Sequence, residues 1–246
     1  MVAWLLVGDA QHAVGQDNGA STKTLATPKI EPRGLPEGAV GQGVPGFWVR
    51  PGYRCDLLAQ LDEARFLCLN PDNGLLYVSQ PNKGAIAVLK PDGQGYTRAD
   101  DLVQGYKTVH GLCWHKGELW FTQSGAIYKC QPDAKTGAHG PITTVIPKGE
   151  LPEGGHWWRP ILVDDTGFYT EIGDSGNIQD EMESDRQKIW RYSLDGKKRS
   201  LFASGMRNTE KLLYRPGTVE VWGMDHGSDN YGKSYGEGGG VQPITD

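Results

Sequence analysis

Short apolar runs alternate with turn-forming residues along most of this chain. Four stretches share one order: an apolar run, a turn rich in Asp, Asn, Pro or Gly, and a second apolar run. This order is typical of a β-hairpin. The paired runs are 66–69 with 75–78, 111–114 with 118–121, 160–163 with 168–170, and 211–214 with 219–222. Because no stretch shows a strong helical periodicity, the pattern predicts an all-β chain.

The hairpins recur at nearly constant intervals. Equivalent places, separated by 45, 49 and 51 residues, are occupied by Leu67, Leu112, Ile161 and Leu212. This period matches the ~40–50 residues of a four-stranded β-propeller blade. Third strands are expected at 85–89, 126–129 and 188–192, and a fourth strand of the third repeat at 200–203. The sequence therefore predicts a partial β-propeller of about four blades over residues 46–232, whereas a β-sandwich gives no reason for such regular spacing.

The two ends of the chain lack this pattern. Residues 1–15 combine an apolar run with small residues, as in the tail of a secretory signal peptide that has lost its basic start, although a chance apolar start is the alternative. Residues 16–45 are expected to be a linker or irregular lead-in, and 233–246 an irregular tail. Six blades of this period need roughly 270–300 residues, so we expect an incomplete ring. A secreted or periplasmic location is expected.

Composition and charge narrow the classes of partner. The 246 residues carry a net charge of −5 with scattered Lys and Arg, so nucleic acid is not an expected partner. No apolar run approaches the ~20 residues of a membrane span. The four cysteines form no Cys-x-x-Cys pair, which disfavours zinc. Cys68 and Cys113 are expected to be buried thiols, and a disulfide between Cys55 and Cys130 is left open.

Polar residues just before an inner strand can face the channel of a propeller, where function is usually carried. Such positions here are His110, His156 with Arg159, and Arg207 with Asn208. In the third repeat, a hairpin returns the end of its second strand beside the start of its first, so His156 and Asp174 are expected to be neighbours. A carboxylate beside an imidazole fixes its tautomer, as a general base requires. The alternative is that Asp174 caps its own turn.

The fourth repeat ends in an oxygen-rich stretch at residues 225–230. Carbonyl and carboxylate oxygens are the ligands that calcium prefers, so this stretch is a candidate calcium site. It lacks the EF-hand pattern, and a solvated turn is the alternative reading.

Several short motifs in this chain occur in the order typical of one enzyme family. They are Gly155-His156, Gly173-Asp174-x-Gly176 with Gln179, Gly205-Met206-Arg207-Asn208, and Asp225-His226-Gly227-Ser228-Asp229. Over about residues 46–232 the chain resembles the soluble quinoprotein glucose and sorbosone dehydrogenases, including aldose sugar dehydrogenases. The resemblance implies a six-bladed β-propeller with pyrroloquinoline quinone (PQQ) over the channel mouth and Ca²⁺ beside it.

The resemblance also implies catalytic roles. His156 would be the general base that takes the proton from the C1 hydroxyl of a sugar, while a hydride passes from C1 to the C5 carbonyl carbon of PQQ. Asp174 would hold and polarise His156, and Arg207 would stabilise charge on the quinone oxygens, as preorganised cations do.

Further roles concern the cofactor and the metal. Gln179 would contact the sugar or the cofactor edge, Asn208 would hydrogen-bond the cofactor, and His226 belongs with these cofactor-binding residues. Backbone oxygens of Gly227 and Ser228 would bind the Ca²⁺ that polarises the quinone. His226 and Ser228 stand where the glucose dehydrogenase branch has Gln and Pro.

Two other departures from the family concern cofactor binding. Thr209 follows Arg207-Asn208 where the family usually has Pro, and the Lys and Arg residues that hold the cofactor carboxylates are not found up to Asp246. Two alternative functions remain: a calcium-dependent lactonase of the gluconolactonase type and a non-catalytic binding propeller.

Overall fold

The computed structural model describes residues 5–8, 53–93 and 95–229. The chain divides into two compact units, the second of which begins at Leu61. In the first unit, β1 (Leu5–Gly8) pairs in antiparallel fashion with β2 (Tyr53–Asp56). The other residues of 1–45 and the whole of the predicted tail at 233–246 lie outside the described residues, so their predicted organisation is untested.

The second unit is built from antiparallel sheets whose strands follow chain order. Three sheets have four strands each, and a fourth sheet has two strands among the described residues. The first contains β3 (Leu67–Leu69), β4 (Leu76–Gln80), β5 (Ala85–Asp92) and β6 (Gly95–Val103). The second contains β7 (Leu112–His115), β8 (Glu118–Gln123), β9 (Ala126–Cys130) and β10 (Thr143–Ile146). The third contains β11 (Leu162–Val163), β12 (Phe168–Ile172), β13 (Lys188–Tyr192) and β14 (Arg199–Ser204), and the fourth contains β15 (Thr209–Tyr214) and β16 (Val221–Asp225).

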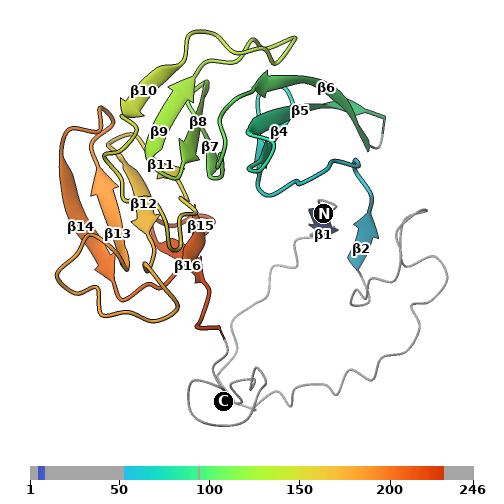
Figure 1. The fold of residues 1–246 in the computed structure, drawn as a ribbon. Helices are drawn as coiled ribbons and strands as arrows, with labels where there is room; N and C mark the ends of the chain where they lie inside the picture. Colours follow the sequence, from blue (N-terminus) through green and yellow to red (C-terminus); the bar gives the residue numbers. More distant parts are fainter. Residues whose placement is uncertain (1–4, 9–52, 94, 230–246) are drawn as a thin grey trace, which may run out of the picture. The chain divides into compact units, whose positions relative to one another are not determined.

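Neighbouring sheets contact each other through their inner strands. β7 contacts both β3 and β11, and β15 contacts β12 of the preceding sheet. Figure 1 shows the three four-stranded sheets of this unit following one another in chain order, each with its later strands farther out. This is the arrangement of propeller blades, so the predicted all-β propeller fold is confirmed.

The apolar core lies between the blades because neighbouring side chains of a strand point to opposite faces of its sheet. In β8, Leu119 and Phe121 pack against the first blade, whereas Trp120 packs against the third. Leu212 of β15 joins Leu162 of β11 in a cluster between the third and fourth blades. The regular spacing seen in the sequence thus reflects one buried layer for each pair of blades.

Two outer strands, β6 and β10, have no counterpart among the strands predicted from the sequence. Much of β6 and the first half of β10 are exposed or half-buried. An outermost strand packs few side chains into the core, so its apolar pattern is weak. The described residues contain no helix long and apolar enough to cross a membrane.

The cysteines within the second unit carry free thiols. Cys68 and Cys130 are buried and Cys113 is half-buried. Burial raises the pKa of the Cys68 and Cys130 thiols to about 12, so both stay protonated and unreactive at neutral pH. The disulfide between Cys55 and Cys130 that the sequence left open stays untested, because the side chain of Cys55 lies outside the described part of the structure.

Candidate functional site

His156 and Asp174 lie side by side at one end of the third blade, as their places in the hairpin predict. The backbone N–H of His156 donates to the backbone oxygen of Asp174 at 2.8 Å. The ring nitrogen Nδ1 of His156 lies 3.1 Å from the same oxygen. A carbonyl oxygen can only accept, so Nδ1 carries the proton and Nε2 is the unprotonated nitrogen of the neutral ring.

The hydrogen bonds of the Asp174 carboxylate go to other groups than this imidazole. It accepts the backbone N–H of Gly176 at 2.7 Å, the backbone N–H of Gln179 at 3.0 Å and the side-chain amide of Gln187 at 2.6 Å. Burial by itself would raise the pKa of the Asp174 carboxyl, but these hydrogen bonds outweigh it and the pKa lies below its ordinary value. The alternative reading of the sequence, an Asp that caps its own turn, therefore describes this side chain.

Two glycines allow the close packing that brings His156 and Asp174 together. A Cβ atom on Gly173 would lie 2.7 Å from the Cβ of His156 and 3.0 Å from the backbone oxygen of Arg207. Gly155 has a φ of +62°, and a Cβ there would lie 2.5 Å from the backbone oxygen of Asp174. The position of the imidazole thus depends on the absence of side chains at two neighbouring positions.

The loop that carries His156 is held by two arginines. Arg186 donates to the backbone oxygens of Glu153, Gly154 and Gly173 at 2.8, 3.2 and 3.0 Å. Arg159, fully buried, donates to the backbone oxygen of His156 at 3.2 Å and to two other oxygens of the same loop. Arg159 was expected at the channel mouth, and here it fixes the loop from within.

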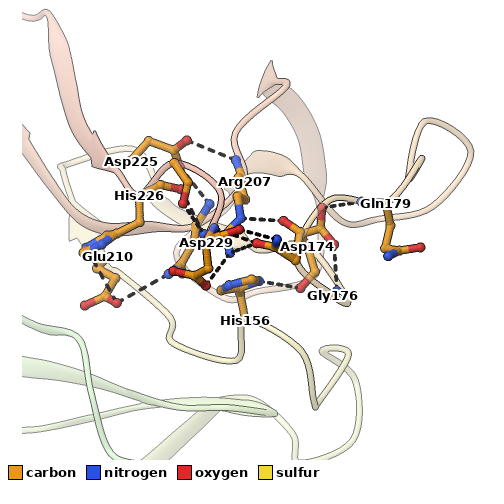
Figure 2. A network of polar contacts seen from close by, with 12 residues as sticks. His156, Asp174, Gly176, Gln179, Arg207, Glu210, Asp225, His226 and Asp229 are labelled. Carbon is orange, nitrogen blue, oxygen red and sulfur yellow. Dashed lines mark hydrogen bonds and ion pairs between the residues drawn. The ribbon is translucent and has the colours of Figure 1, made fainter. Parts of the chain in front are cut away.

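All five N–H donors of the Arg207 side chain have acceptors within the protein. Nε and Nη2 donate to the backbone and side-chain oxygens of Asn177, at 2.6 and 2.9 Å. Nη1 donates to the backbone oxygens of His226 and Gly227 at 3.1 and 2.7 Å, and Nη2 also contacts the Asp229 carboxylate at 3.1 Å. Asn177 and Asp229 bind each other directly as well. Arg207 thereby ties the turn after β12 to the segment after β16, as Figure 2 shows for its contacts with Asp225 and Asp229.

Asn208 and Asp225 complete the start of the fourth blade. The Asp225 carboxylate accepts the backbone N–H of Asn208 at 2.8 Å and the hydroxyl of Thr209 at 3.0 Å. The side-chain nitrogen of Asn208 lies 3.4 Å from Glu210, while its side-chain oxygen is buried without a partner among the described residues. Asn208 therefore keeps one buried acceptor that the rest of the site does not use.

Three other predicted residues lie around this network. The side chain of Gln179 is exposed, and Figure 2 shows it apart from the other labelled side chains. Gly227 is exposed, Ser228 is half-buried, and the Gly227 oxygen is the one that accepts from Arg207. Within the described part of the chain, no group of three or more His, Cys, Asp or Glu side chains is placed to hold a metal ion.

The buried carboxylate of Glu210 connects several blades, and the sequence analysis did not single it out. It pairs with Arg65, which precedes the first blade, and lies 3.9 Å from Nε2 of His110 and 3.8 Å from Nε2 of His226. Figure 2 shows Glu210 beside His226. The sequence signal for Glu210 was an acidic residue at the start of a largely apolar strand, because a carboxylate that such a strand buries needs polar partners.

His110, another predicted channel position, is fully buried between aromatic rings. Its ring centroid lies 4.4 Å from that of Phe66 and 4.5 Å from that of Trp158. Burial lowers the pKa of His110 to about 3, so the ring is neutral at physiological pH. Its surroundings are those of a core histidine.

Glu171 is a further buried carboxyl group at this end of the third blade. Burial raises its pKa well above the ordinary value, and the charge of Arg159 opposes this shift only in part. The sequence pattern singled out no role for Glu171, which stands between Thr170 and Ile172 in β12.

Comparisons with known proteins support the fold. No family model matches the chain, and no curated protein matches its sequence. Among solved structures, the PQQ domain of pyranose dehydrogenase from Coprinopsis cinerea superposes with a TM-score of 0.60 at 17% identity, over 71% of this chain and 48% of that one. PQQ-bound aldose sugar dehydrogenase from Streptomyces coelicolor gives 0.51 at 21% identity, over 69% and 58%. A nidogen/laminin complex gives 0.51 at 14% identity, over 71% and 61%.

These similarities establish a propeller fold shared by sugar dehydrogenases and by a structure of another kind. The chain spans about half the length of the dehydrogenase structures that it matches. At identities this low, the activity has to be argued from the site itself.

Proposed function

We propose that this chain carries the catalytic base of a PQQ-dependent sugar dehydrogenase, which oxidises an aldose or related sugar at C1. The single observation that carries the proposal is the state of His156. Its Nδ1–H donates to a backbone oxygen, which leaves Nε2 as the free basic nitrogen of a half-buried imidazole. A neutral imidazole held in one tautomer can take a proton from a hydroxyl group.

In this proposal the chain's own residues orient the sugar and move one proton. His156 Nε2 accepts the proton of the C1 hydroxyl, and the Asp174 carbonyl stabilises the imidazolium through Nδ1–H. Gln179, whose side chain is exposed, is available to a sugar hydroxyl. PQQ, when bound, supplies the acceptor for the two electrons that leave C1.

The residues fit a bound quinone at one position in particular. The buried side-chain oxygen of Asn208, without a partner among the described residues, suits a donor on the cofactor. Arg207 has no free N–H, so its part in the proposal is the fixed positive charge that it adds near the mouth. His226, whose side chain is half exposed, would lie at the edge of the cofactor.

The calcium part of the proposal concerns the backbone oxygens of Gly227 and Ser228. The Gly227 oxygen already accepts a hydrogen bond from the Arg207 guanidinium. A cation on the same oxygen would face that positive charge, so the Ser228 oxygen is the better of the two ligands.

The experiment combines the protein with PQQ, Ca²⁺, an aldose and a redox dye, and follows the bleaching of the dye. Bleaching that requires all components, and that falls about 10²–10⁴-fold in His156→Ala, supports the proposal. The control is His139→Ala, because His139 is exposed on the second blade and outside the site. Wild-type turnover in His156→Ala would exclude His156 as the base.

All five N–H donors of the Arg207 side chain are already used within the protein, and this favours one competing function, a binding propeller without catalysis. In that case the Arg207 network holds a docking surface in shape, and the His156 tautomer has no chemical role. Binding of PQQ distinguishes the two functions, because only a dehydrogenase requires it.

A further inference from the structure

A hollow of about 470 Å³ opens on the same side of the blades as His156. Three segments line it: the loop before β7, the turn between β8 and β9, and the loop before β11 that also carries His156. In an antiparallel sheet of this strand order, the connection into the first strand and the turn between the second and third strands lie at the same end. The hollow and the proposed base therefore share one face of the propeller.

Trp157 gives the hollow a fixed aromatic wall. Its side chain is half-buried, and its ring centroid lies 3.9 Å from that of Trp158. Trp158 in turn packs 4.5 Å from the buried ring of His110. Trp157 is thus the outer member of an aromatic stack that begins in the core, so its ring is held in place before any ligand arrives.

A hydroxyl group in the lining of the hollow has no partner among the described residues. Ser124 is 6% exposed, and its Oγ atom is buried without a hydrogen bond to the described residues. Its backbone N–H donates to the hydroxyl of Thr108 at 3.1 Å. Thr108 is β-branched and has a φ of +69°, a strained conformation that persists only where the surroundings enforce it. An unpartnered hydroxyl next to enforced strain points to a ligand site.

The polar rim of the hollow is also held by contacts. The Gln123 amide donates to the backbone oxygen of Lys107 at 2.6 Å and accepts from the hydroxyl of Tyr128 at 2.9 Å. The Glu153 carboxylate packs over Gly125, where a Cβ atom would collide with it. Lys107 and Lys148 add positive charge. The rim therefore offers hydrogen-bond donors and acceptors, together with one negative and two positive charges.

We propose that this hollow binds a pyranose unit of an oligosaccharide whose reducing end reaches His156, a proposal that rests on the proposed sugar oxidation. A pyranose ring has an apolar C–H face, which suits the Trp157 ring, and a rim of hydroxyls that both donate and accept. The hollow offers both kinds of surface, and its volume falls within the 300–1,000 Å³ of small-molecule sites. The substrate class is then an oligosaccharide rather than a free monosaccharide.

The test is calorimetric titration of the full chain, without PQQ, by cellotetraose, by maltotetraose and by glucose. We expect one tetrasaccharide to bind at least about tenfold more tightly than glucose. Trp157→Ala should weaken that binding about tenfold or more, whereas Trp222→Ala should not, because Trp222 is exposed on β16 outside the hollow. Equal binding of the tetrasaccharide by Trp157→Ala, or no binding of either tetrasaccharide, would overturn the proposal.

Ser124→Ala provides a test that leaves the backbone contact with Thr108 in place. It should weaken tetrasaccharide binding several-fold while melting like the wild type, and unchanged binding would count against the hollow. Failure of the proposed function gives a different result, namely tetrasaccharide binding in the hollow without sugar-dependent dye reduction. Dye reduction with glucose but no tetrasaccharide binding would overturn only the oligosaccharide proposal.

Discussion

The ring nitrogen Nδ1 of His156 lies 3.1 Å from the backbone oxygen of Asp174, while the Asp174 carboxylate binds the turn that follows it. The orientation of the imidazole therefore depends on main chain rather than on a charged side chain. Substitution of the Asp174 side chain leaves this backbone contact in place. Its effect on stability can therefore be separated from its effect on catalysis, which would not be possible if the carboxylate itself held the imidazole.

Asp174→Asn should therefore affect stability more than catalysis. We expect less than about a tenfold loss of turnover, compared with about 10²–10⁴-fold for His156→Ala, because the contact to Nδ1 remains. The free energy of unfolding at pH 7 should fall by about 1–3 kcal/mol, because a buried carboxylate loses charge-assisted hydrogen bonds. Turnover and denaturant unfolding of both variants provide the measurement.

The stability loss in Asp174→Asn should depend on pH. The pKa of the Asp174 carboxyl is lowered in the folded protein, so its contribution is present above the unfolded value of about 3.9 and is lost as the pH falls through the lowered pKa. The difference between wild type and variant should therefore shrink below about pH 4. A difference that stays constant from pH 7 to pH 3 would contradict this assignment.

Arg207→Lys should loosen two segments at once. A lysine ammonium has three donors and no planar fork, so it cannot reproduce contacts to both Asn177 and the 226–229 segment. Hydrogen exchange should rise at 176–179 and at 226–229 together. Arg215→Lys, which alters an exposed ion pair with Glu220, is the matched control and should leave both segments unchanged.

His110→Gln should make the stability of the fold less dependent on pH in the acid range. The folded protein holds the His110 pKa at about 3, below the unfolded value of about 6.5. The unfolded chain then binds more protons, so stability falls as the pH drops from about 6.5 towards 3. Melting temperatures measured across that range should fall less steeply in His110→Gln than in wild type. His139→Gln, a change at an exposed histidine, should keep the wild-type slope.

Trp222→Lys should reduce self-association of this chain. β16 pairs with β15 alone among the described residues, and Val219, Trp222 and Met224 are 91%, 56% and 69% exposed. Exposed apolar side chains on an edge strand favour pairing between copies, and a lysine there opposes it. Light scattering should show smaller particles for Trp222→Lys, and a monomeric wild-type protein would remove the basis of this prediction.

The sequence by itself determined the blades. The hairpins at 67–80, 112–123, 162–172 and 209–225 could be read directly, because an alternating apolar pattern and a Gly-, Asn- or Asp-containing turn are local properties. The same local logic placed His156 beside Asp174, since a hairpin returns the end of its second strand to the start of its first. The outer strands β6 and β10 were not predicted, because they bury few side chains and their apolar pattern is weak.

Only the tertiary structure decided what the polar side chains contact. The Asp174 carboxylate could contact either an imidazole or the N–H groups of its own turn, and in the folded chain it accepts the backbone N–H groups of Gly176 and Gln179. The pairing of Arg65 with Glu210 joins residues 145 positions apart, at the starts of the first and fourth blades. No local pattern encodes such a pair, because it exists only once the blades have packed side by side and their inner strands have brought the two charges together out of water.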